Sequence, residues 1–536
     1  MNYHIDNRFS ILPAVVLMSM VNNREADAQM TADHQPNILF AISDDQSFPH
    51  ASAYGTPAIS TPTFDSLARE GVLFTNAFVA APQSSPSRAA ILTGRNIWQL
   101  EEAGTHGSLF PKKFKVFTDV LEAHGYAIGF TGKAWGPGNW QLSGWQRNPV
   151  GPEYNRHTLT QAPYSGIKNV DYVSNFKEFI RERKDLQPFF FWYGSHEPHR
   201  DFEYGSGLHS GKALSEADVP PFLPQDDVVR QDILDYNTEI EWFDKKLGEM
   251  INYLREIGEL ENTIIVVTSD NGMAFPYAKA NLYELGTHVP LLISGKKYFE
   301  GERKINDLVS LIDLAPTFLE LTGTPLYQGI TGKSLASLLS GKLAKAGREH
   351  REFILTGRER HTHARPDNLG YPSRAIRTKD FLYIKNYKPE RWPVGNPPEK
   401  VHFDSSVSED IKPIGGGFAD IDESPTKERM IKNSCQFPGL FKKAFEKRPA
   451  EELYDIKNDP YCLVNICDDN RYSEIKDHLR RIMEEELKTQ GDPRVWGYGE
   501  IFESYPRFGL MRNFSGFKKR GKYNERYQKK LSNENR

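Results

Sequence analysis

Cysteine is scarce in this sequence, which has only 3 among its 536 residues. Cys435, Cys462 and Cys467 all lie late in the chain, with no CxxC pair and no histidine cluster beside them. Three thiols form at most one disulfide bond, so a disulfide framework is excluded, and the spacing does not favour a zinc site.

The chain also lacks an excess of either charge and, apart from its first residues, any extended apolar run. Lys and Arg number 67 and Asp and Glu number 71, so the formal net charge is −4. This balance is not typical of a general nucleic-acid-binding protein. Hydrophobic residues at 38% and charged residues at 26% exclude a coiled coil or a mainly disordered chain. We therefore expect a large folded protein with no nucleic-acid partner and no membrane span.

The first 28 residues resemble a targeting segment. Arg8 precedes an apolar run over residues 9–21, which is too short for a spanning helix. Ala26-Asp27-Ala28 then supplies the small residues of an A-x-A cleavage pattern. This order predicts a signal peptide over residues 1–28 and a periplasmic or secreted mature protein. The alternative is a disordered or buried N-terminal segment.

Apolar runs alternate with amphipathic stretches over residues 29–345. The pattern predicts strands at residues 36–43, 127–131, 189–193, 263–268 and 289–294, and helices at residues 116–123, 232–257 and 308–321. Such alternation indicates an α/β sheet with helices on both faces. We expect these residues to form the catalytic domain.

The pattern changes after about residue 345. Strand-like pieces over 374–387, a Pro- and Gly-rich loop over 389–417 and a helical stretch over 473–488 predict a smaller α+β domain at residues 346–506. Residues 507–536 hold ten Lys or Arg against two Glu. They are either a solvated basic tail, which we prefer, or a segment that attracts a polyanionic glycan.

Polar residues follow three of the predicted strands. Asp44-Asp45, the segment 196–200 (HEPHR) and Asp270-Asn271 each come directly after an apolar run. Ligands of α/β sheets gather at the carboxyl ends of strands, so these side chains are candidates for one site. An acidic residue after a strand is often only a helix cap, but two such acidic sites argue against that interpretation.

The most informative stretch is SSPSRAAILTGR, from Ser84 to Arg95. Ser and Pro before an apolar run are typical of a helix start, which also offers free backbone N–H groups to an anion. That explanation needs neither Arg88 nor Thr93-Gly94-Arg95. The guanidinium of Arg88 is a donor fork suited to a tetrahedral oxyanion.

This stretch resembles the signature of the type I sulfatases of the alkaline phosphatase superfamily, which is Cys or Ser, any residue, Pro, Ser, Arg, three residues and Leu-Thr-Gly. It is complete here from Ser84 to Gly94, and the resemblance runs from residue 36 to about residue 468. It implies a large mixed sheet sandwiched by helices and a smaller C-terminal α+β domain. It also implies that Ser84 is oxidised to Cα-formylglycine, the nucleophile, by a radical maturase of the kind found in anaerobic bacteria.

The resemblance extends to a metal site and to the groups around the sulfate. It implies one Ca²⁺ ion held by Asp44, Asp45, Asp270 and Asn271 beside Ser84, and such hard oxygen ligands suit Ca²⁺ or Mg²⁺ better than zinc. It further implies that Arg88 holds the formylglycine, that Lys133 and Lys279 bind sulfate oxygens, and that His199 faces the ester.

Several residues are candidates for saccharide contacts. Trp135 stands where the family usually has a histidine, and it either packs internally or offers a stacking face to a sugar. His196 is a candidate for orienting its neighbours. The remaining candidates are His361, His363, Arg365 and Arg374, which are either substrate contacts or ordinary charges, and His106, which is weaker.

The resemblance also implies the chemistry. A serine would form a stable sulfate ester, whereas a hydrated aldehyde has one hydroxyl to attack sulfur and a second whose deprotonation expels sulfate. A carboxylate such as Asp45 would deprotonate the first hydroxyl with help from the metal, and the cations would offset charge on the sulfuryl oxygens. His199 or Lys279 would protonate the leaving oxygen.

Within the family the sequence is most similar to heparan N-sulfatases, the sulfamidases. Trp135 and Lys279 depart from the animal sulfamidases, so the choice between N-sulfate and O-sulfate stays open. We therefore expect a sulfatase acting on a sulfated glycan or glycosaminoglycan saccharide. The alternatives are a sulfamidase specifically, a phosphodiesterase or phosphonate hydrolase of the same superfamily, and a sulfated-glycan-binding pseudoenzyme in which Ser84 is never oxidised.

Overall fold

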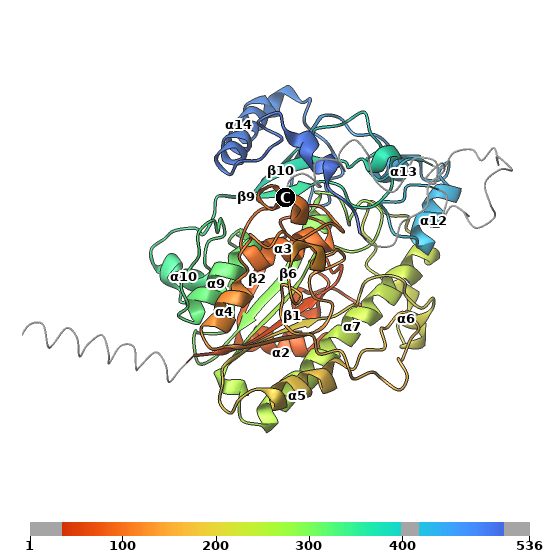
Figure 1. Cartoon of the computed structure of the whole chain (residues 1–536). Helices are drawn as coiled ribbons and strands as arrows, with labels where there is room; N and C mark the ends of the chain where they lie inside the picture. Colours follow the sequence, from red (N-terminus) through yellow and green to blue (C-terminus); the bar gives the residue numbers. More distant parts are fainter. Residues whose placement is uncertain (1–34, 398–416, 509–536) are drawn as a thin grey trace, which may run out of the picture.

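A large sheet forms the centre of the molecule (Figure 1). The computed structural model describes residues 35–397 and 417–508. The strand order is β3-β4-β1-β5-β6-β2-β7, and β8 also pairs with β2. The strands are β1 (Asn37–Ser43), β2 (Val72–Phe78), β3 (Ala127–Gly132), β4 (Phe189–Gly194), β5 (Thr263–Ser269), β6 (His288–Ser294), β7 (Arg303–Ile305) and β8 (Val309–Ser310).

The sheet is mixed, as the family resemblance implied. β3, β4, β1 and β5 are four adjacent parallel strands, whereas β6 runs antiparallel to both β5 and β2. The five strands predicted from the sequence are confirmed to within one or two residues at each end. β2 was missed, because two polar residues, Thr75 and Asn76, interrupt its apolar run.

Helices cover both faces of the sheet, and the alternation of side chains along β1 shows why. Phe40 packs in the hydrophobic cluster that contains α3 (Ser84–Thr93), α4 (Phe117–Ala123) and α9 (Leu314–Leu321). Its neighbours Leu39 and Ala41 pack in the cluster that contains α2 (Pro62–Glu70), α5 (Tyr172–Glu182) and α7 (Asp227–Glu256). Successive residues of a strand point to opposite faces, so a continuous apolar run is what a sheet covered on both sides requires.

One predicted helix is shorter than expected. The apolar stretch over residues 308–321 begins with β8 and a short 3-10 turn, and α9 itself starts only at Leu314. Val309 pairs with Ala77 of β2, so the first residues of this run extend the sheet. Periodicity alone does not separate a short buried strand from the start of a buried helix.

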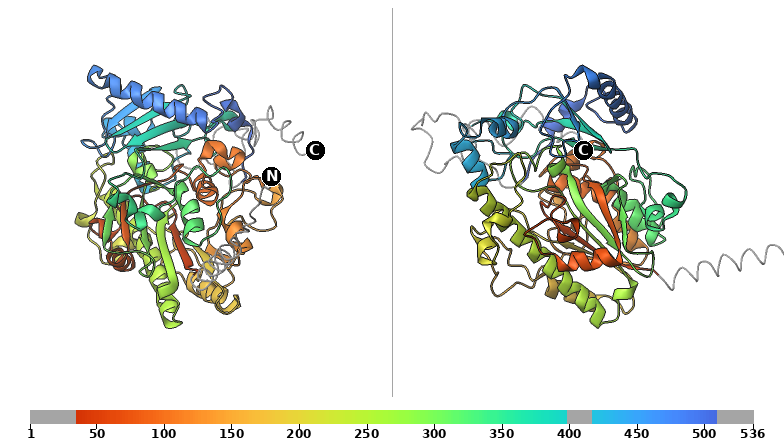
Figure 2. Two further views of the ribbon diagram at one scale, coloured as in Figure 1. Left: turned by 90° about the vertical axis from the view of Figure 1, so that its left-hand side faces the viewer. Right: turned by 180° about the vertical axis from the view of Figure 1, so that it is seen from behind.

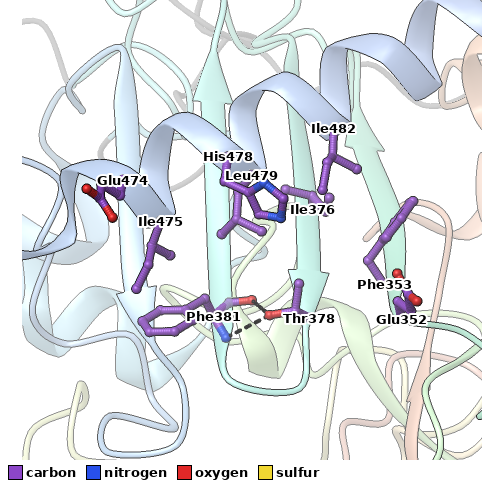
Figure 3. Close-up of a pocket in the computed structure, with 10 residues that line it drawn as sticks. All are labelled: Glu352, Phe353, Ile376, Thr378, Phe381, Glu474, Ile475, His478, Leu479 and Ile482. Atoms are coloured by element: carbon purple, nitrogen blue, oxygen red, sulfur yellow. Dashed lines mark hydrogen bonds between the residues drawn. The ribbon is translucent and has the colours of Figure 1, made fainter.

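A second, antiparallel sheet follows in the chain, in the order β12-β11-β10-β9. Its strands are β9 (Phe353–Arg358), β10 (Ser373–Thr378), β11 (Phe381–Asn386) and β12 (Glu451–Asp455). α14 (Ser473–Thr489) lies over this sheet, on the side away from the large sheet (Figure 2). Between them is a groove of 440 Å³ into which Ile475 and Leu479 of α14 project (Figure 3). None of the predicted site residues lines this groove.

The remaining helices are short. They are α6 (Ser206–His209), α8 (Glu284–Thr287), α10 (Ala336–Leu339), α11 (Lys342–Lys345), α12 (Pro425–Lys432) and α13 (Pro438–Phe445). None of the helices within the described ranges is long and apolar enough to cross a membrane. All three cysteines are free thiols.

The division of the chain near residue 345 stays a prediction. Three of the hydrophobic clusters contain side chains from both parts, for example Phe275 with Leu382, so the parts share their cores. The predicted signal peptide at residues 1–28, part of the predicted loop and all but the first two residues of the basic tail at 507–536 lie outside the described residues.

Candidate active site

Four strand ends meet at one edge of the large sheet. β3, β4, β1 and β5 are parallel neighbours, and Gly132, Gly194 and Ile42 lie in register near their carboxyl ends. The next residues are therefore neighbours in space: Lys133 after β3, the segment from Ser195 to Arg200 after β4, Asp44 and Asp45 after β1, and Asp270 and Asn271 after β5. Parallel strand order, which the sequence does not reveal, assembles the predicted site.

A glycine is required where β3 ends. Gly132 has a φ of 76°, which L side chains rarely adopt, and a Cβ atom there would lie 2.0 Å from the carbonyl oxygen of Gly194. The main chain of Lys133 therefore lies directly against the end of β4, where its N–H donates to that same carbonyl at 2.7 Å.

Ser84 is the first residue of α3, and its hydroxyl faces the strand ends. Gln83 is the N-cap residue and makes no side-chain capping bond. The Ser84 Oγ donates to Asp44 Oδ1 at 3.0 Å and accepts from Lys133 Nζ at 2.9 Å. Asn271 Oδ1 lies 3.4 Å away. The hydroxyl thus contacts a carboxylate, an amide and an ammonium group.

Three buried carboxylates form a cluster beside this hydroxyl. One carboxylate oxygen from each of Asp44, Asp45 and Asp270 lies within 4.8 Å of the others, and Asn271 Nδ2 donates to Asp45 Oδ1 at 2.7 Å. Burial raises the pKa of Asp270, and the nearby charge of Asp44 adds to this effect. Burial also opposes ionisation of Asp44, but Lys133 and His199 outweigh it and hold its pKa well below the usual value.

Arg88 connects α3 to the carboxylate cluster. Its side chain is fully buried, and Nε donates to Asp270 Oδ2 at 2.7 Å. Nη1 donates to the main-chain carbonyls of Lys133 and Ala134 at 2.6 and 3.1 Å. Arg88 therefore fixes α3, the β3 loop and the β5 end relative to one another. Its spacing of four residues from Ser84 places both on the same face of α3.

Lys279 supplies a second buried cation, from the loop between β5 and β6. Its Nζ lies 2.5 Å from Asp45 Oδ2 and 3.1 Å from Asp422 Oδ2. Burial by itself would lower its pKa, but Asp422 and Asp45 together raise the pKa above the usual lysine value. Asp422 was not predicted, because it follows a Gly-rich loop far along the chain and no local motif marks it.

The two histidines after β4 lie at the open side of the cluster. His199 Nε2 is 3.9 Å from Asp45 Oδ2, and 37% of its side chain is exposed. Its Nδ1 lies 2.7 Å from the carbonyl oxygen of Arg200. His196 is partly buried, and this burial lowers its pKa to about 4, so it is a neutral imidazole near pH 7. His199 is therefore placed to meet a ligand that approaches the cluster.

The structure corrects the suggestion that Trp135 stacks on a sugar. The residue is 3% exposed, its Nε1 donates to the carbonyl of Ser85 at 3.1 Å, and its ring packs edge-on against Phe110. A Cβ atom on Gly138 would lie 2.4 Å from the indole ring. With both ring faces enclosed, Trp135 supports the start of α3 and offers no surface to a saccharide.

Arg374 and Arg365 are corrected in the same way. Arg374 is fully buried on β10 and pairs with Asp492 and Glu359 at 2.7 and 2.8 Å. Arg365 is 2% exposed, pairs with Asp420 at 2.7 Å and donates to the carbonyl of Trp392. Because buried charges are satisfied by partners inside the protein, both arginines hold the second sheet and its loops together. Neither is free to contact a saccharide.

His106, His361 and His363 gather beside the site. The rings of His106 and His361 are 4.6 Å apart, and Nδ1 of His106 lies 3.0 Å from the carbonyl oxygen of His361. Burial lowers the pKa of His106. The N–H of its neighbour Gly107 donates to Ser85 Oγ at 2.9 Å, which places His106 near the start of α3. Burial also lowers the pKa of His363 to about 3. Arg507, whose Nε donates to the carbonyl of His361 at 3.1 Å, was missed because it lay in the predicted tail.

Residues 36–324 match the family model described as Sulfatase, which is more than half of the chain. The chain belongs to the sulfatase family. A second model, described as the C-terminal region of N-sulphoglucosamine sulphohydrolase, matches residues 274–394. The protein is therefore a sulfuric ester hydrolase, and the prediction of a type I sulfatase is confirmed over the phosphodiesterase alternative.

Relatives of this sulfatase come from animals and bacteria. It is 28% identical to N-sulphoglucosamine sulphohydrolase of Homo sapiens, over 83% of this chain and 88% of that protein. It is 26% identical to an ulvan-active sulfatase of Formosa agariphila, over 87% of this chain and 77% of the relative. It is also 26% identical to an N-acetylglucosamine-6-O-sulfatase of Bacteroides thetaiotaomicron, over 62% and 75%.

Solved structures share the fold of this sulfatase. A protein in complex with its substrate D-glucosamine-2-N,6-O-disulfate aligns with a TM-score of 0.59 at 22% identity, over 85% of this chain and 98% of the other. A 2-O glycosaminoglycan sulfatase aligns with the same TM-score of 0.59 at 18% identity, over 86% and 94%. The predicted α/β architecture with a large mixed sheet is confirmed.

Proposed function

We propose that this sulfatase removes sulfate from a sulfated glycan or glycosaminoglycan-derived saccharide, through a formylglycine made from Ser84. The observation that carries the proposal is the position of the Ser84 hydroxyl. It stands at the start of a complete signature helix, within hydrogen-bond distance of Asp44 and Lys133 and beside the buried carboxylate cluster. An ordinary helix-capping serine would need none of these contacts.

The chemistry depends on the oxidation of Ser84. As a hydrated aldehyde, this residue supplies one hydroxyl that attacks sulfur and a second that allows sulfate to be released. Asp44 Oδ1 accepts the hydrogen bond of the Ser84 hydroxyl, so this carboxylate is placed to take up the proton of a hydroxyl at that position. Arg88 keeps α3 and the strand ends in register, so the nucleophile stays aimed at the same point.

The cationic groups around Ser84 fit a sulfate ester. Lys133 and Lys279 flank the carboxylate cluster from two directions, and His199 lies at its exposed side. We propose that they bind the sulfuryl oxygens and offset charge that develops there. His199, or Lys279, then donates the proton that the leaving oxygen needs.

We propose one Ca²⁺ ion as the metal, held by Asp44, Asp45, Asp270 and Asn271 next to residue 84. The donor set fits, because it offers three carboxylates and an amide oxygen, with no thiol or imidazole in the cluster among the described residues. A bound ion would supply electrophilic charge at the sulfate, as cations do in phosphoryl-type transfers.

The relatives support a saccharide substrate. They act, by name, on N-sulfoglucosamine, ulvan and N-acetylglucosamine 6-sulfate, and a structural neighbour was solved with a disulfated glucosamine. We propose that His196 contacts the sugar. His106, His361 and His363, which were candidates from the sequence, are buried like Trp135 and Arg365 and offer no surface to a saccharide. The match to the C-terminal model of N-sulphoglucosamine sulphohydrolase favours a sulfated glucosamine unit, with its N-sulfate as the finer alternative.

The location and the maturation are part of the same proposal. A periplasmic or secreted bacterial enzyme is supported by the A-x-A pattern at residues 26–28 and by its bacterial relatives. A serine at position 84 supports a radical maturase as the partner that makes the aldehyde.

The deciding experiment is the mass of the peptide that contains Ser84, taken from protein of the native host. The proposal expects the loss of two hydrogen atoms at Ser84 and capture of that peptide by a hydrazide reagent. Hydrolysis of a panel of N- and O-sulfated saccharides would then define the substrate. An unmodified Ser84 in every native copy would refute the formylglycine mechanism and favour the glycan-binding pseudoenzyme.

A further inference from the structure

Lys279 is held between two carboxylates that come from different parts of the chain. Its side chain is 6% exposed, and its ammonium lies 2.5 Å from Asp45 Oδ2 and 3.1 Å from Asp422 Oδ2. Asp45 follows β1 of the large sheet, whereas Asp422 precedes α12, after β11 of the small sheet. A long lysine side chain has many rotamers, so two fixed anions define where its ammonium sits.

The segment that carries Asp422 is anchored without any help from Lys279. Phe418 and Ile421 are buried in the same hydrophobic cluster as Tyr277 and Ala278, the residues just before Lys279. Asp420 pairs with Arg358 at 2.9 Å and with Arg365 at 2.7 Å. Asp422 is therefore a fixed anion to which the lysine must adapt.

The two carboxylates are not equivalent. Asp45 belongs to the cluster that has the oxygen ligands for a divalent cation, together with Asp44 and Asp270. Asp422 is not a member of that cluster. A cation bound there would draw on the charge of Asp45, so the electrostatic hold of Asp45 on Lys279 would weaken while that of Asp422 would remain. Asp422 is thus the carboxylate that would keep its full electrostatic hold on the lysine.

We propose that Asp422 is a positioning residue for the sulfatase reaction, which acts through Lys279. It holds the ammonium of Lys279 at the carboxylate cluster, and in this way the segment between β11 and α12 supplies part of the active site. The inference rests on the role of Lys279 in the proposed function and adds a residue that the sulfatase signature does not contain.

The test is a double-mutant cycle on the matured enzyme, with rates normalised to aldehyde content. Asp422→Asn keeps the shape of the side chain and removes its charge, and Lys279→Met removes the ammonium. We expect Asp422→Asn to lower kcat/KM for a sulfated saccharide about tenfold in the wild-type background and less than about twofold beside Lys279→Met. The double variant should also melt at a higher temperature than Lys279→Met alone, since Asp422→Asn removes a negative charge that otherwise lies close to Asp45 with no lysine between them.

Asp492→Asn is the matched control. Asp492 is another buried aspartate of the small domain and pairs with Arg374, which does not contact the site. This variant should lower the melting temperature without a dependence on residue 279. Asp422→Glu, which restores the charge, should recover more activity than Asp422→Asn.

The outcomes separate this proposal from the one on which it rests. An equal loss from Asp422→Asn in both backgrounds would overturn the positioning role and indicate direct saccharide contact or general destabilisation. Full activity of Asp422→Asn, with Lys279→Met impaired, would also overturn it and leave the role of Lys279 intact. Full activity of Lys279→Met would instead refute the role given to that lysine in the proposed function.

Discussion

At the scale of single residues, two adjacent serines illustrate how position decides function. Ser84 and Ser85 are both buried at the start of α3. The hydroxyl of Ser84 contacts Asp44 and Lys133, whereas that of Ser85 accepts a hydrogen bond from the main-chain N–H of Gly107 at 2.9 Å. One hydroxyl belongs to the charged site and the other ties a loop to the helix.

Ser84→Ala should abolish turnover and leave the fold intact. The variant cannot form the aldehyde, so the loss of kcat should exceed about 10³-fold, as when a covalent nucleophile is removed. Steady-state hydrolysis of a sulfated saccharide measures it, with thermal melting as the check on folding. Ser85→Ala is the matched control and should keep most of its activity. Comparable losses in both variants would contradict a special role for Ser84.

At the scale of elements, the start of α9 depends on one buried carboxylate. Asp313 accepts hydrogen bonds from the main-chain N–H groups of Ser310 and Lys333, at 3.1 and 2.6 Å. It also forms ion pairs with Arg351 and His350. Although burial opposes its ionisation, Arg351 and His350 lower the pKa of Asp313 to about 2. The ion pairs of Asp313 therefore hold the start of α9, the helix that packs against α3.

The stability that Asp313 provides should vanish in acid. A carboxyl group whose pKa is lower in the folded state stabilises the fold above its unfolded pKa, near 4, and loses this contribution as the pH falls toward about 2. Asp313→Asn should therefore cost roughly 3–5 kcal/mol at pH 7, as expected when one partner of a buried pair is removed. Denaturant unfolding of both proteins from pH 7 to the acid limit measures the difference, which should shrink below pH 4. A difference that is constant over this range would contradict the ion-pair explanation.

Arg374 should matter for the second sheet and not for the substrate. It is buried on β10 between Asp492 and Glu359, so Arg374→Met leaves two carboxylates without their cation and should cost roughly 3–5 kcal/mol. The measurements are chemical unfolding and the KM of the folded variant. KM should change less than about twofold, and a large rise in KM with unchanged stability would restore Arg374 as a saccharide contact.

At the scale of the whole molecule, one buried site joins four strand ends and a helix. Repulsion among Asp44, Asp45 and Asp270 is offset by Arg88, Lys133 and Lys279, so the fold tolerates three buried carboxylates at the cost of stability. A cation that binds only the folded protein must stabilise it by mass action.

Metal removal should lower both stability and activity. Treatment with a chelator should reduce the melting temperature, and Ca²⁺ added to 100 times its dissociation constant should restore about 2.7 kcal/mol. Titration calorimetry with Ca²⁺ alone provides a second readout that does not depend on turnover. Asp45→Asn should lose the heat of binding and the thermal shift, while Asp492→Asn should keep both. Equal Ca²⁺ binding by Asp45→Asn would place the ion elsewhere.

Several features followed from the sequence alone, because they depend on local chemistry. Continuous apolar runs specify buried strands, so β1, β3, β4, β5 and β6 were found from them. The signature from Ser84 to Gly94 identified the family, since this motif requires particular residues at fixed spacing, and it indicated Ser84 as the candidate nucleophile. Asp44 and Asp270 were singled out because polar residues directly after apolar runs stand out in a sequence, whereas Lys133 was expected only from the family resemblance.

What the tertiary structure decided depends on contacts between distant segments. Burial turned Trp135, Arg365 and Arg374 from candidate contacts into internal supports, and no pattern in the sequence reports which polar side chains find partners. Asp422 lies 143 residues after Lys279 in the chain. It contacts the lysine only because the second sheet packs against the first. The order of strands in the large sheet placed the carboxyl ends of β3, β4, β1 and β5 side by side. The sequence contains the chemistry of the site, but only the fold, through long-range pairing and shared cores, brings those groups within bonding distance.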